Sequence, residues 1–239
     1  MKASVYTRHG DESEIRISDH VLRPVPTADE LLVKVQAAGV NPVDVKLREN
    51  SLPDWFIPLP KIIGSDLCGI VEEVGDNVYE GFQVGDRVFA MMPHIWSGWG
   101  STAQYAVVNH AIVVPAPKNI TSIEAASLPL IGLTVLQGFR PFIEAHLNDT
   151  AGRKVLIQAG AGGLGTFAVQ YCKHALGMQV FASCSAANGP FVQSLGADVV
   201  IDYKTQRFEE LCEGMDVVFD PVAYLYEHRT FNSNVLKKV

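Results

Sequence analysis

The stretch Val155-Leu-Ile-Gln-Ala-Gly-Ala-Gly-Gly-Leu-Gly-Thr-Phe-Ala-Val-Gln-Tyr171 decides the fold. It opens with the apolar run of a buried strand, passes through glycines and alanines, and continues with apolar residues at helical spacing. The residues that share one helical face are Leu164, Phe167, Ala168, Tyr171, Cys172 and Ala175. The stretch therefore predicts a strand, a bare turn and a helix that packs on a sheet.

The glycines of this stretch predict a dinucleotide site. Gly160, Gly162 and Gly165 follow the pattern G-x-G-x-x-G between a predicted strand and a predicted helix, which is the context that the pattern requires. A bare turn lets a pyrophosphate approach the helix N-terminus, where N–H groups and the helix dipole favour an anion. The residues expected at the cofactor are Gly160, Ala161, Gly162, Gly163, Leu164 and Gly165. A turn that serves only the packing of strand and helix is the alternative.

The absence of acidic residues from 161 to 197 predicts the kind of dinucleotide. NAD-binding folds usually place Asp or Glu about 20 residues after the glycines, where it binds the ribose 2′-hydroxyl. A carboxylate would repel a 2′-phosphate, whereas hydroxyl and amide groups can donate hydrogen bonds to it. We therefore predict NADP (NADPH), held by side chains at the ends of the second and third strands: Ser183, Ser185, Asn188 and Tyr203, with Lys204 beside them.

The predicted secondary structure changes near residue 118. Before it, short strands are predicted over 31–36, 69–74, 87–91 and 104–108, separated by turns. After it, helices over 122–126 and 128–139 precede strands over 155–158, 180–182, 199–201 and 217–219, in the rhythm of a parallel sheet. We predict an α/β protein with a β-rich domain over 1–118 and a dinucleotide-binding domain over 119–239.

Composition excludes several classes of protein. A chain of 239 residues that is 48% hydrophobic and 19% charged is typical of a globular protein, and no apolar run is long enough for a membrane span. A net charge of −7 without a Lys/Arg run argues against nucleic acid as a partner. The opening MKASVYTRHG matches no targeting signal, so we predict a cytoplasmic protein.

The cysteines indicate neither a disulfide framework nor a zinc ribbon. Cys68, Cys172, Cys184 and Cys212 form no CxxC pair and have no histidine at ligand spacing. We expect them to be reduced, half-buried core residues.

Further motifs occur in collinear order along nearly the whole chain. They are Ala37-Ala-Gly-Val-Asn-Pro-Val-Asp44, Gly64-Ser-Asp-Leu-Cys-Gly-Ile-Val71, Gly85-Asp-Arg-Val-Phe89, Ala125-Ala-Ser-Leu-Pro-Leu-Ile-Gly-Leu-Thr134 and Ser194-Leu-Gly-Ala-Asp-Val-Val-Ile-Asp-Tyr203. With the glycine turn, they resemble the zinc-independent quinone oxidoreductases (zeta-crystallin-like) of the medium-chain dehydrogenase/reductase superfamily, including the reticulon-4-interacting branch. The resemblance implies a GroES-like β-rich domain followed by a Rossmann domain.

The resemblance also implies a chemistry. Zinc alcohol dehydrogenases of the superfamily carry Cys in the place of Asn41 and a His-Glu pair in the place of Ser65-Asp66, so no metal is expected here. NADPH would reduce a quinone or an α,β-unsaturated carbonyl, with Asn41 as the catalytic residue beside the nicotinamide and Thr134 near the same end of the cofactor. An enoyl-thioester reductase is the alternative enzyme, and a non-catalytic NADPH-binding or interaction protein is the alternative of another class.

Three departures from the family pattern are visible. Lys46, Leu47 and Arg48 occur where family members often carry a tyrosine, so no proton donor is identified. Ala223 occupies the usual place of a glycine. The chain ends at Leu236-Lys-Lys-Val239, where a fifth strand would begin, which predicts a C-terminally truncated Rossmann domain whose uncovered edge favours a homo-oligomer.

Trp96 and Trp99 are candidates for an aromatic pocket wall.

Overall fold

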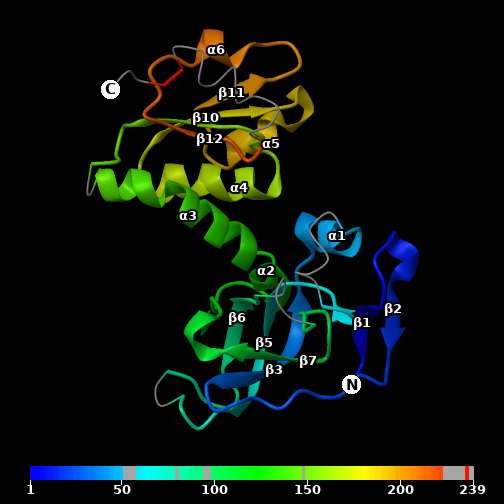
Figure 1. The fold of residues 1–239 in the computed structure, drawn as a ribbon. Coiled ribbons are helices and arrows are strands. Elements are labelled where there is room, and N and C mark those ends of the chain that lie inside the picture. Colours follow the sequence, from blue (N-terminus) through cyan, green and yellow to red (C-terminus); the bar gives the residue numbers. More distant parts are fainter. Residues whose placement is uncertain (51–57, 79–80, 94–97, 147–148, 223–234, 237–239) are drawn as a thin grey trace. The chain divides into compact units, whose positions relative to one another are not determined.

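A computed structural model of the protein describes residues 1–50, 58–78, 81–93, 98–146, 149–222 and 235–236. The chain forms two compact units, Met1–Leu130 and Ile131–Val239, which can be followed by colour in Figure 1. The predicted domain boundary between residues 118 and 119 stays a prediction. The predicted fold class is confirmed, because antiparallel sheets make up the first unit and a parallel sheet makes up the second.

The first unit contains a smaller and a larger antiparallel sheet within the described residues. The smaller has the order β2-β1-β4, with bounds β1 Ala3–Tyr6, β2 Arg16–Ser18 and β4 Lys61–Ile62. The larger has the order β7-β3-β5-β6-β8, with bounds β3 Glu30–Ala38, β5 Asp66–Val74, β6 Arg87–Met91, β7 Tyr105–Asn109 and β8 Val113–Pro115. Where the structure describes this unit, its helices are α1 Pro42–Arg48 and α2 Ser122–Ala126, with short 3-10 turns at Glu12–Glu14 and His110–Ile112.

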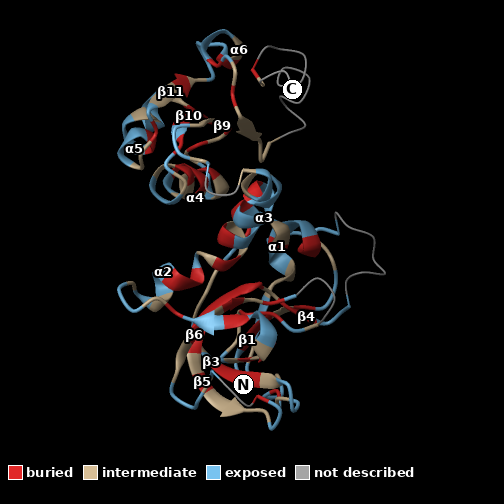
Figure 2. Ribbon diagram, turned by 90° about the vertical axis from the view of Figure 1, so that its left-hand side faces the viewer, coloured by how far each residue is buried: buried red, intermediate tan, exposed pale blue. Residues whose placement is uncertain are grey.

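Apolar side chains from the central strands of the larger sheet form the core of the first unit. Leu31 and Val33 of β3 pack with Leu67 and Val71 of β5 and Val88 of β6, and all five are fully buried. The buried residues of these strands are red in Figure 2. Burying an aliphatic side chain contributes about 1.5–3 kcal/mol, so this alternating pattern of strand residues holds the sheet together.

The second unit is a parallel sheet with the strand order β11-β10-β9-β12 within the described residues. Its bounds are β9 Lys154–Ile157, β10 Gln179–Cys184, β11 Val199–Asp202 and β12 Val217–Phe219. The helices are α3 Pro129–Ala145, which begins in the first unit, α4 Gly163–Gln170, α5 Gly189–Ser194 and α6 Phe208–Leu211, with a 3-10 turn at Ala186–Asn188.

This strand order fixes where a ligand can bind. The chain moves outward from β9 to β10 and β11, then crosses back so that β12 pairs with the other side of β9. Doubly wound sheets bind ligands at such a reversal, beyond the carboxyl ends of the strands. The glycine turn directly follows β9 and therefore lies at this point.

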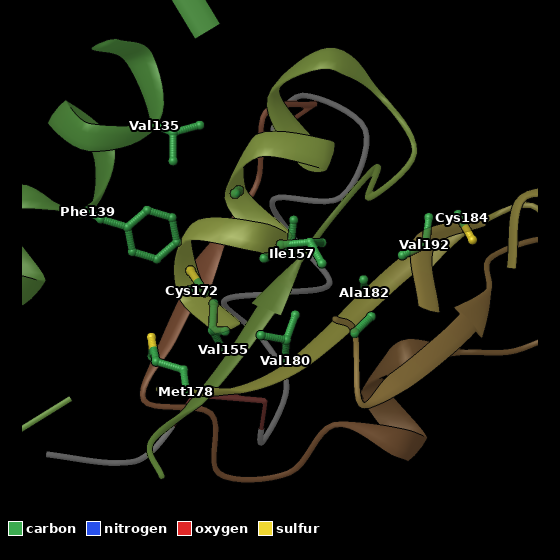
Figure 3. Close-up of a cluster of buried hydrophobic side chains, with 13 residues drawn as sticks. Val135, Phe139, Val155, Ile157, Cys172, Met178, Val180, Ala182, Cys184 and Val192 are labelled. Atoms are coloured by element: carbon green, nitrogen blue, oxygen red, sulfur yellow. The ribbon is translucent and has the colours of Figure 1, made fainter. Parts of the chain in front are cut away.

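Helices and strands meet in the apolar core of the second unit, shown in Figure 3. Phe139 of α3 packs with Val155 and Ile157 of β9, and its ring stacks on Phe219 of β12 with centroids 5.2 Å apart. The predicted helix face holds as far as Cys172, but Ala175 is exposed. A π-helical turn over Tyr171–Ala175 changes the angular spacing of the residues and removes Ala175 from the face.

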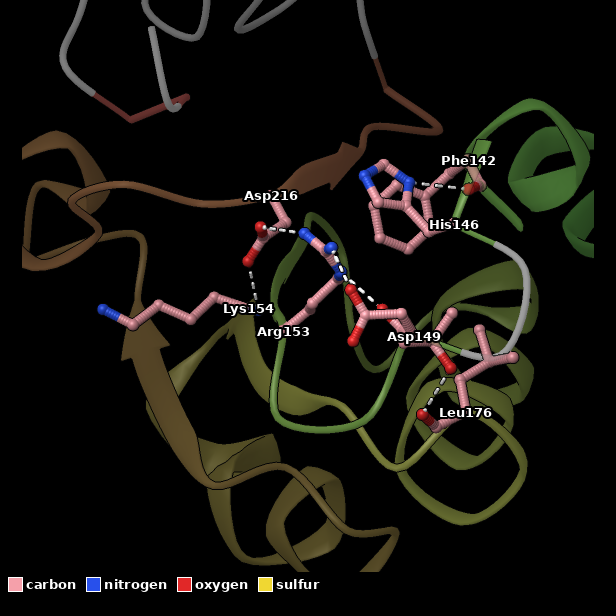
Figure 4. A network of polar contacts seen from close by, with 8 residues as sticks. Phe142, His146, Asp149, Arg153, Lys154, Leu176 and Asp216 are labelled. Carbon is pink, nitrogen blue, oxygen red and sulfur yellow. Dashed lines mark hydrogen bonds and ion pairs between the residues drawn. The ribbon is translucent and has the colours of Figure 1, made fainter. Parts of the chain in front are cut away.

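A polar network fastens the start of β9 to the segment before β12, as Figure 4 shows. The Asp216 carboxylate accepts a hydrogen bond from Arg153 Nη1 at 3.0 Å and from the Lys154 backbone N–H at 2.8 Å. Only 4% of the Asp216 side chain is exposed, so both contacts are shielded from water.

Two further expectations can be compared with the described residues. All four cysteines are free thiols in the core, and they are buried rather than half-buried as predicted. No described helix combines the length and hydropathy that crossing a membrane would require.

Candidate functional site

The turn between β9 and α4 has the shape of a phosphate-binding loop. Ala159 adopts a left-handed backbone conformation, with φ at 53°, and reverses the chain directly after the strand. The Gly160 N–H donates to the Ser183 carbonyl oxygen at 2.7 Å, and the Gly162 N–H donates to the Ala159 carbonyl oxygen at 2.9 Å. These bonds hold the turn against β10 and start α4 at Gly163.

The three motif glycines lack a side chain for different reasons. A Cβ on Gly165 would lie 2.1 Å from the Ala159 oxygen, and a Cβ on Gly160 would lie 3.0 Å from the Ala182 Cβ, so both positions are needed for close packing. A Cβ on Gly162 would come no closer than 3.3 Å to the Ala159 oxygen. Because Gly162 is also exposed, the bare backbone there is available to a ligand.

The N-terminus of α4 can receive an anion. Gly162 is the N-cap and makes no side-chain cap hydrogen bond, and Thr166 N–H to the Gly162 oxygen, at 2.8 Å, closes the first helical turn. The amides of Gly163, Leu164 and Gly165 therefore lie in the part of a helix that has no intrahelical acceptors. The turn fits a dinucleotide pyrophosphate, since Gly162 leaves the backbone open and the first amides of α4 have no intrahelical acceptors.

Ser183 lies beneath this turn rather than on its surface. It is 2% exposed, its hydroxyl donates to Gln158 Oε1, and it accepts the Ala159 N–H at 3.2 Å. The Gln158 side chain is 1% exposed. These contacts support the left-handed turn, so Ser183 and Gln158 position the loop from below.

The other predicted side chains gather at the ends of β10 and β11. Ser185 is half-buried, and Asn188 and Tyr203 are exposed. The Asn188 N–H donates to the Ser185 oxygen at 2.9 Å within the loop after β10. The Tyr203 N–H donates to the Cys184 oxygen at 3.2 Å, which links the ends of β10 and β11. Lys204 is exposed and directly follows Tyr203.

Sequence reasoning missed Asp202 at this place. Its carboxylate accepts hydrogen bonds from the Lys204 N–H at 3.2 Å and the Thr205 hydroxyl at 2.9 Å. The Lys204 N–H chiefly holds the pKa of Asp202 below its usual range, and the Ala186 N–H adds to the effect. A negative charge thus adjoins the loop after β10, contributed by the neighbouring strand rather than by the acid-free segment.

Thr134 is exposed on α3, three residues after Ile131. A Cβ on Gly163 would lie 3.8 Å from Ile131 Cγ2, so the early part of α3 within the second unit adjoins the first residue of α4. Thr134 therefore lies one helical turn away from the glycine loop.

A second polar site lies in the first unit, around Asn41. Asn41 is the N-cap of α1 and is 7% exposed, and Pro42 follows it as the first helical residue. The Asn41 N–H donates to Asp44 Oδ2 at 2.7 Å, while Asn41 Nδ2 donates to Asp66 Oδ2 at 3.0 Å and to Ser65 Oγ at 3.3 Å. Asn41, Ser65 and Asp66 thus form one buried cluster.

Burial gives Asp66 an unusual acidity. It is 1% exposed, and burial raises its pKa from the ordinary 3.8 to about 6, assisted by the negative charge of Asp44. Hydrogen bonds from Asn41 and from the Leu130 N–H act in the opposite direction. Groups whose pKa is shifted by burial and specific partners often occur at functional sites.

Lys61 and Tyr6 form a buried pair that the sequence analysis did not identify. They lie opposite each other across β4 and β1, and each is 1% exposed. Burial lowers the pKa of Lys61 to about 8, against the effect of Asp44, and burial raises the pKa of Tyr6 to about 12. The signal available in the sequence is a lysine within the apolar run Leu59-Pro-Lys-Ile-Ile63.

The remaining expectations concern a metal and the pocket walls. Among the described residues, no group of three or more His, Cys, Asp or Glu side chains could hold a metal ion. Trp99 is 39% exposed. Trp96 and Ala223 lie outside the described residues.

Comparison with known proteins identifies the two halves of the chain. The profile described as alcohol dehydrogenase GroES-like domain matches residues 27–118, and the profile described as zinc-binding dehydrogenase matches residues 163–235. The chain is 37% identical over 227 residues to the chloroplastic quinone-oxidoreductase homolog of Spinacia oleracea, covering 94% of this chain and 68% of that protein. It is 36% identical to the chloroplastic NADPH-dependent alkenal/one oxidoreductase of Arabidopsis thaliana, covering 93% of this chain.

A solved structure agrees with these matches. The quinone oxidoreductase of Escherichia coli complexed with NADPH has a TM-score of 0.83 and 25% sequence identity, covering 100% of this chain and 71% of that one. The chain spans only 57% of the length of the Arabidopsis relative. The collinear motifs, the two domain types and these matches show that the chain belongs to the zeta-crystallin-like quinone oxidoreductase family of the medium-chain dehydrogenase/reductase superfamily.

Proposed function

We propose that the protein is an NADPH-dependent oxidoreductase that reduces a quinone or an α,β-unsaturated carbonyl. The observation that carries this proposal is the open backbone at Gly162, at the strand-order reversal and in front of the first amides of α4. The Arabidopsis relative is named for NADPH and for alkenal/one substrates, and the spinach relative is named for quinones.

The second unit would hold the cofactor. Gly160, Ala161, Gly162, Gly163, Leu164 and Gly165 would receive the pyrophosphate through main-chain amides. Hydroxyl and amide groups of Ser185, Asn188 and Tyr203 would donate to the 2′-phosphate, and the ammonium group of Lys204 would balance the charge of Asp202. Ser183 would act indirectly by supporting the turn, since its hydroxyl is already bonded to Gln158 and Ala159. Thr134 would face the nicotinamide end.

The first unit would supply the substrate site. NADPH, when bound, supplies the hydride; the protein orients the electrophilic carbon and excludes water. Asn41 is the proposed catalytic residue, because it is a buried amide held by specific partners at the family position. We propose that the reaction needs no zinc, since an amide at position 41 and a hydroxyl at position 65 replace the strong ligands of the zinc enzymes.

The finer features of the whole protein remain part of the proposal. Residues 1–118 would form the substrate domain and residues 119–239 the NADP-binding domain. A homo-oligomer and a cytoplasmic address are predictions from the sequence, and the spinach and Arabidopsis relatives carry chloroplastic names.

A substrate panel tests the proposal. Oxidation of NADPH is followed at 340 nm with a quinone, an enone and an enoyl thioester, with and without a chelator. We expect turnover with the quinone or the enone that the chelator does not change. Faster turnover of the enoyl thioester would favour that alternative, and NADPH binding without oxidation by any substrate would favour a non-catalytic binding protein.

A further inference from the structure

Asp66 connects two segments of the first unit through its two carboxylate oxygens. Oδ1 accepts the Leu130 N–H at 3.1 Å, in the first turn of α3, and Oδ2 accepts Asn41 Nδ2 at 3.0 Å. Gly39 packs closely against Asp66, because a Cβ on Gly39 would lie 2.9 Å from the Asp66 Cβ and 2.6 Å from the Ala126 oxygen. The side chain is therefore fixed in place by packing as well as by hydrogen bonds.

These contacts decide which way the Asn41 amide is turned. An ionised carboxylate only accepts hydrogen bonds, so the atom of Asn41 that meets Asp66 must be the nitrogen. Its two N–H groups are directed to Asp66 and, more weakly, to Ser65 Oγ at 3.3 Å. The amide oxygen of Asn41 takes part in neither contact. It lies on the side of the Asp44 N–H in the capping box of α1, and as a carbonyl oxygen it has a second lone pair for another donor.

We propose that Asp66 is a positioning residue that orients Asn41 so that its amide oxygen, an acceptor, faces the ligand. The inference rests on the proposed function, and it narrows the role of Asn41. In this orientation Asn41 binds an N–H or O–H donor of the bound dinucleotide, such as a carboxamide or a ribose hydroxyl. It does not donate a hydrogen bond to the carbonyl oxygen of the substrate.

The orientation of the Asn41 amide depends on whether Asp66 is ionised, and few charged groups surround Asp66. Asp44 of α1 is the ionisable side chain that acts on Asp66, and α3 contributes the Leu130 N–H. From β6, Met91 pairs with Asp66 and brings no charge. Protonation would give Asp66 an O–H donor, which would pair with the Asn41 oxygen and turn the Asn41 nitrogen outward.

Asp66→Asn imitates this reversal with nearly the same shape. The Leu130 N–H requires an acceptor, so it retains the new amide oxygen and leaves the new amide nitrogen to meet Asn41. Asn41 must then present its oxygen to position 66 and its nitrogen to the ligand. We expect turnover and NADPH affinity to fall about tenfold, as for a lost charge-assisted hydrogen bond.

Two further variants separate orientation from folding. Asn41→Asp combined with Asp66→Asn places an acceptor outward again, and we expect it to recover much of the lost NADPH affinity. Asp86→Asn is the matched control, because Asp86 accepts the Gln83 N–H at 2.9 Å in an exposed turn, and it should leave both quantities unchanged. The proposal would be overturned if Asp66→Asn kept wild-type turnover and NADPH affinity, or if the double variant recovered none of the lost NADPH affinity.

A spectroscopic readout keeps this proposal separate from the proposed activity. The side-chain amide resonances of Asn41, assigned by their loss in Asn41→Ala, are followed by NMR from pH 5 to pH 8. In the wild type they should move with a midpoint near the Asp66 pKa of about 6, and in Asp66→Asn they should not. If no substrate is turned over, the proposed function fails, while an Asn41 resonance that ignores pH or titrates alike in both proteins overturns the positioning role.

Discussion

Gly162 and Gly165 lie in one turn, yet a methyl group would have a different effect at each. At Gly165 the new Cβ would lie 2.1 Å from the Ala159 oxygen, a backbone atom that cannot move without disrupting the turn. At Gly162 the nearest atom is the same oxygen at 3.3 Å, so a methyl group needs a shift of only a few tenths of an ångström, yet it would stand in the path of a pyrophosphate.

We therefore predict opposite outcomes for the two alanine variants. Gly165→Ala should lower the free energy of unfolding by about 1–3 kcal/mol, a typical cost of overpacking. Gly162→Ala should keep nearly wild-type stability and lose at least about tenfold in NADPH affinity. Urea unfolding and calorimetric titration measure the two effects. A stability loss at Gly162 as large as that at Gly165 would show that both glycines serve packing alone.

Asp66 gives the stability of the protein a definite pH dependence. Burial raises its pKa from 3.8 to about 6, so the folded protein resists its ionisation. The protonated Asp66 carboxyl therefore stabilises the folded protein. This contribution to the free energy of unfolding is fully present below pH 3.8 and is lost as pH rises through about 6. Relative to Asp66→Asn, the wild type should therefore lose about 1–3 kcal/mol of unfolding free energy between acid and neutral pH.

Urea unfolding of both proteins at pH 4.5 and pH 7.5 measures this difference. The comparison uses only the change between the two pH values, so a constant effect of the substitution cancels. A stability difference between the two proteins that is the same at both pH values would mean that Asp66 ionises as easily in the folded chain as in the unfolded one.

At the scale of elements, the network of Figure 4 adds side-chain contacts beside the backbone pairing of β9 with β12. Asp216 accepts from Arg153 and from the Lys154 N–H in a site that exposes only 4% of its side chain. In Asp216→Asn the Arg153 guanidinium would keep its exposed partner Asp149 but lose its buried one, and the Lys154 N–H would lose a charged acceptor. We expect a loss of about 1–3 kcal/mol in unfolding free energy, as for a shielded hydrogen bond to a charged group.

Glu144→Gln provides the matched control for this prediction. Glu144 pairs with Arg140 on α3 at 2.7 Å, but 60% of its side chain is exposed. Exposed ion pairs contribute about 0–1 kcal/mol, so this variant should unfold nearly as the wild type does. Equal losses in the two variants, measured by urea unfolding, would contradict a special role of the Asp216 network.

Elements with strong periodicity could be predicted from the sequence. The expected strand over 87–91 coincides with β6, the strand over 217–219 with β12, and the helix over 122–126 with α2. The helix α3 continues to Ala145 although Pro141 lies inside it, because Phe139 and its neighbours bury an apolar face. The strands β1, β2, β4 and β8 were missed, because they are too short to display alternation and, unlike the equally short β12, do not belong to a repeating strand–helix rhythm.

The candidate site could be predicted only where chemistry depends on local sequence. The glycine turn was recognised because its backbone requires residues without side chains, and Gly165 bears this out sterically. Asp202 and the contacts of Asp66 with Asn41 and Leu130 depend on pairing between distant segments. No spacing along the chain specifies such pairing, so the orientation of Asn41 could be recognised only in three dimensions.

At the scale of the whole molecule, the family assignment and the cofactor proposal depend on different observations. Collinear motifs and matched domains identify the family, whereas the preference for NADPH depends on the donors at the ends of β10 and β11. Asp202 opposes a 2′-phosphate and Lys204 favours it, so side-chain donors and main-chain amides must decide the balance.

The most direct test of the account is a calorimetric titration of the protein with NADPH and with NADH under the same conditions. We predict that NADPH binds at least about tenfold more tightly, which corresponds to about 1.4 kcal/mol from the added phosphate. NADH binding that is equal or tighter would contradict the phosphate site, and a failure of both to bind would contradict the cofactor role of the turn over 160–165.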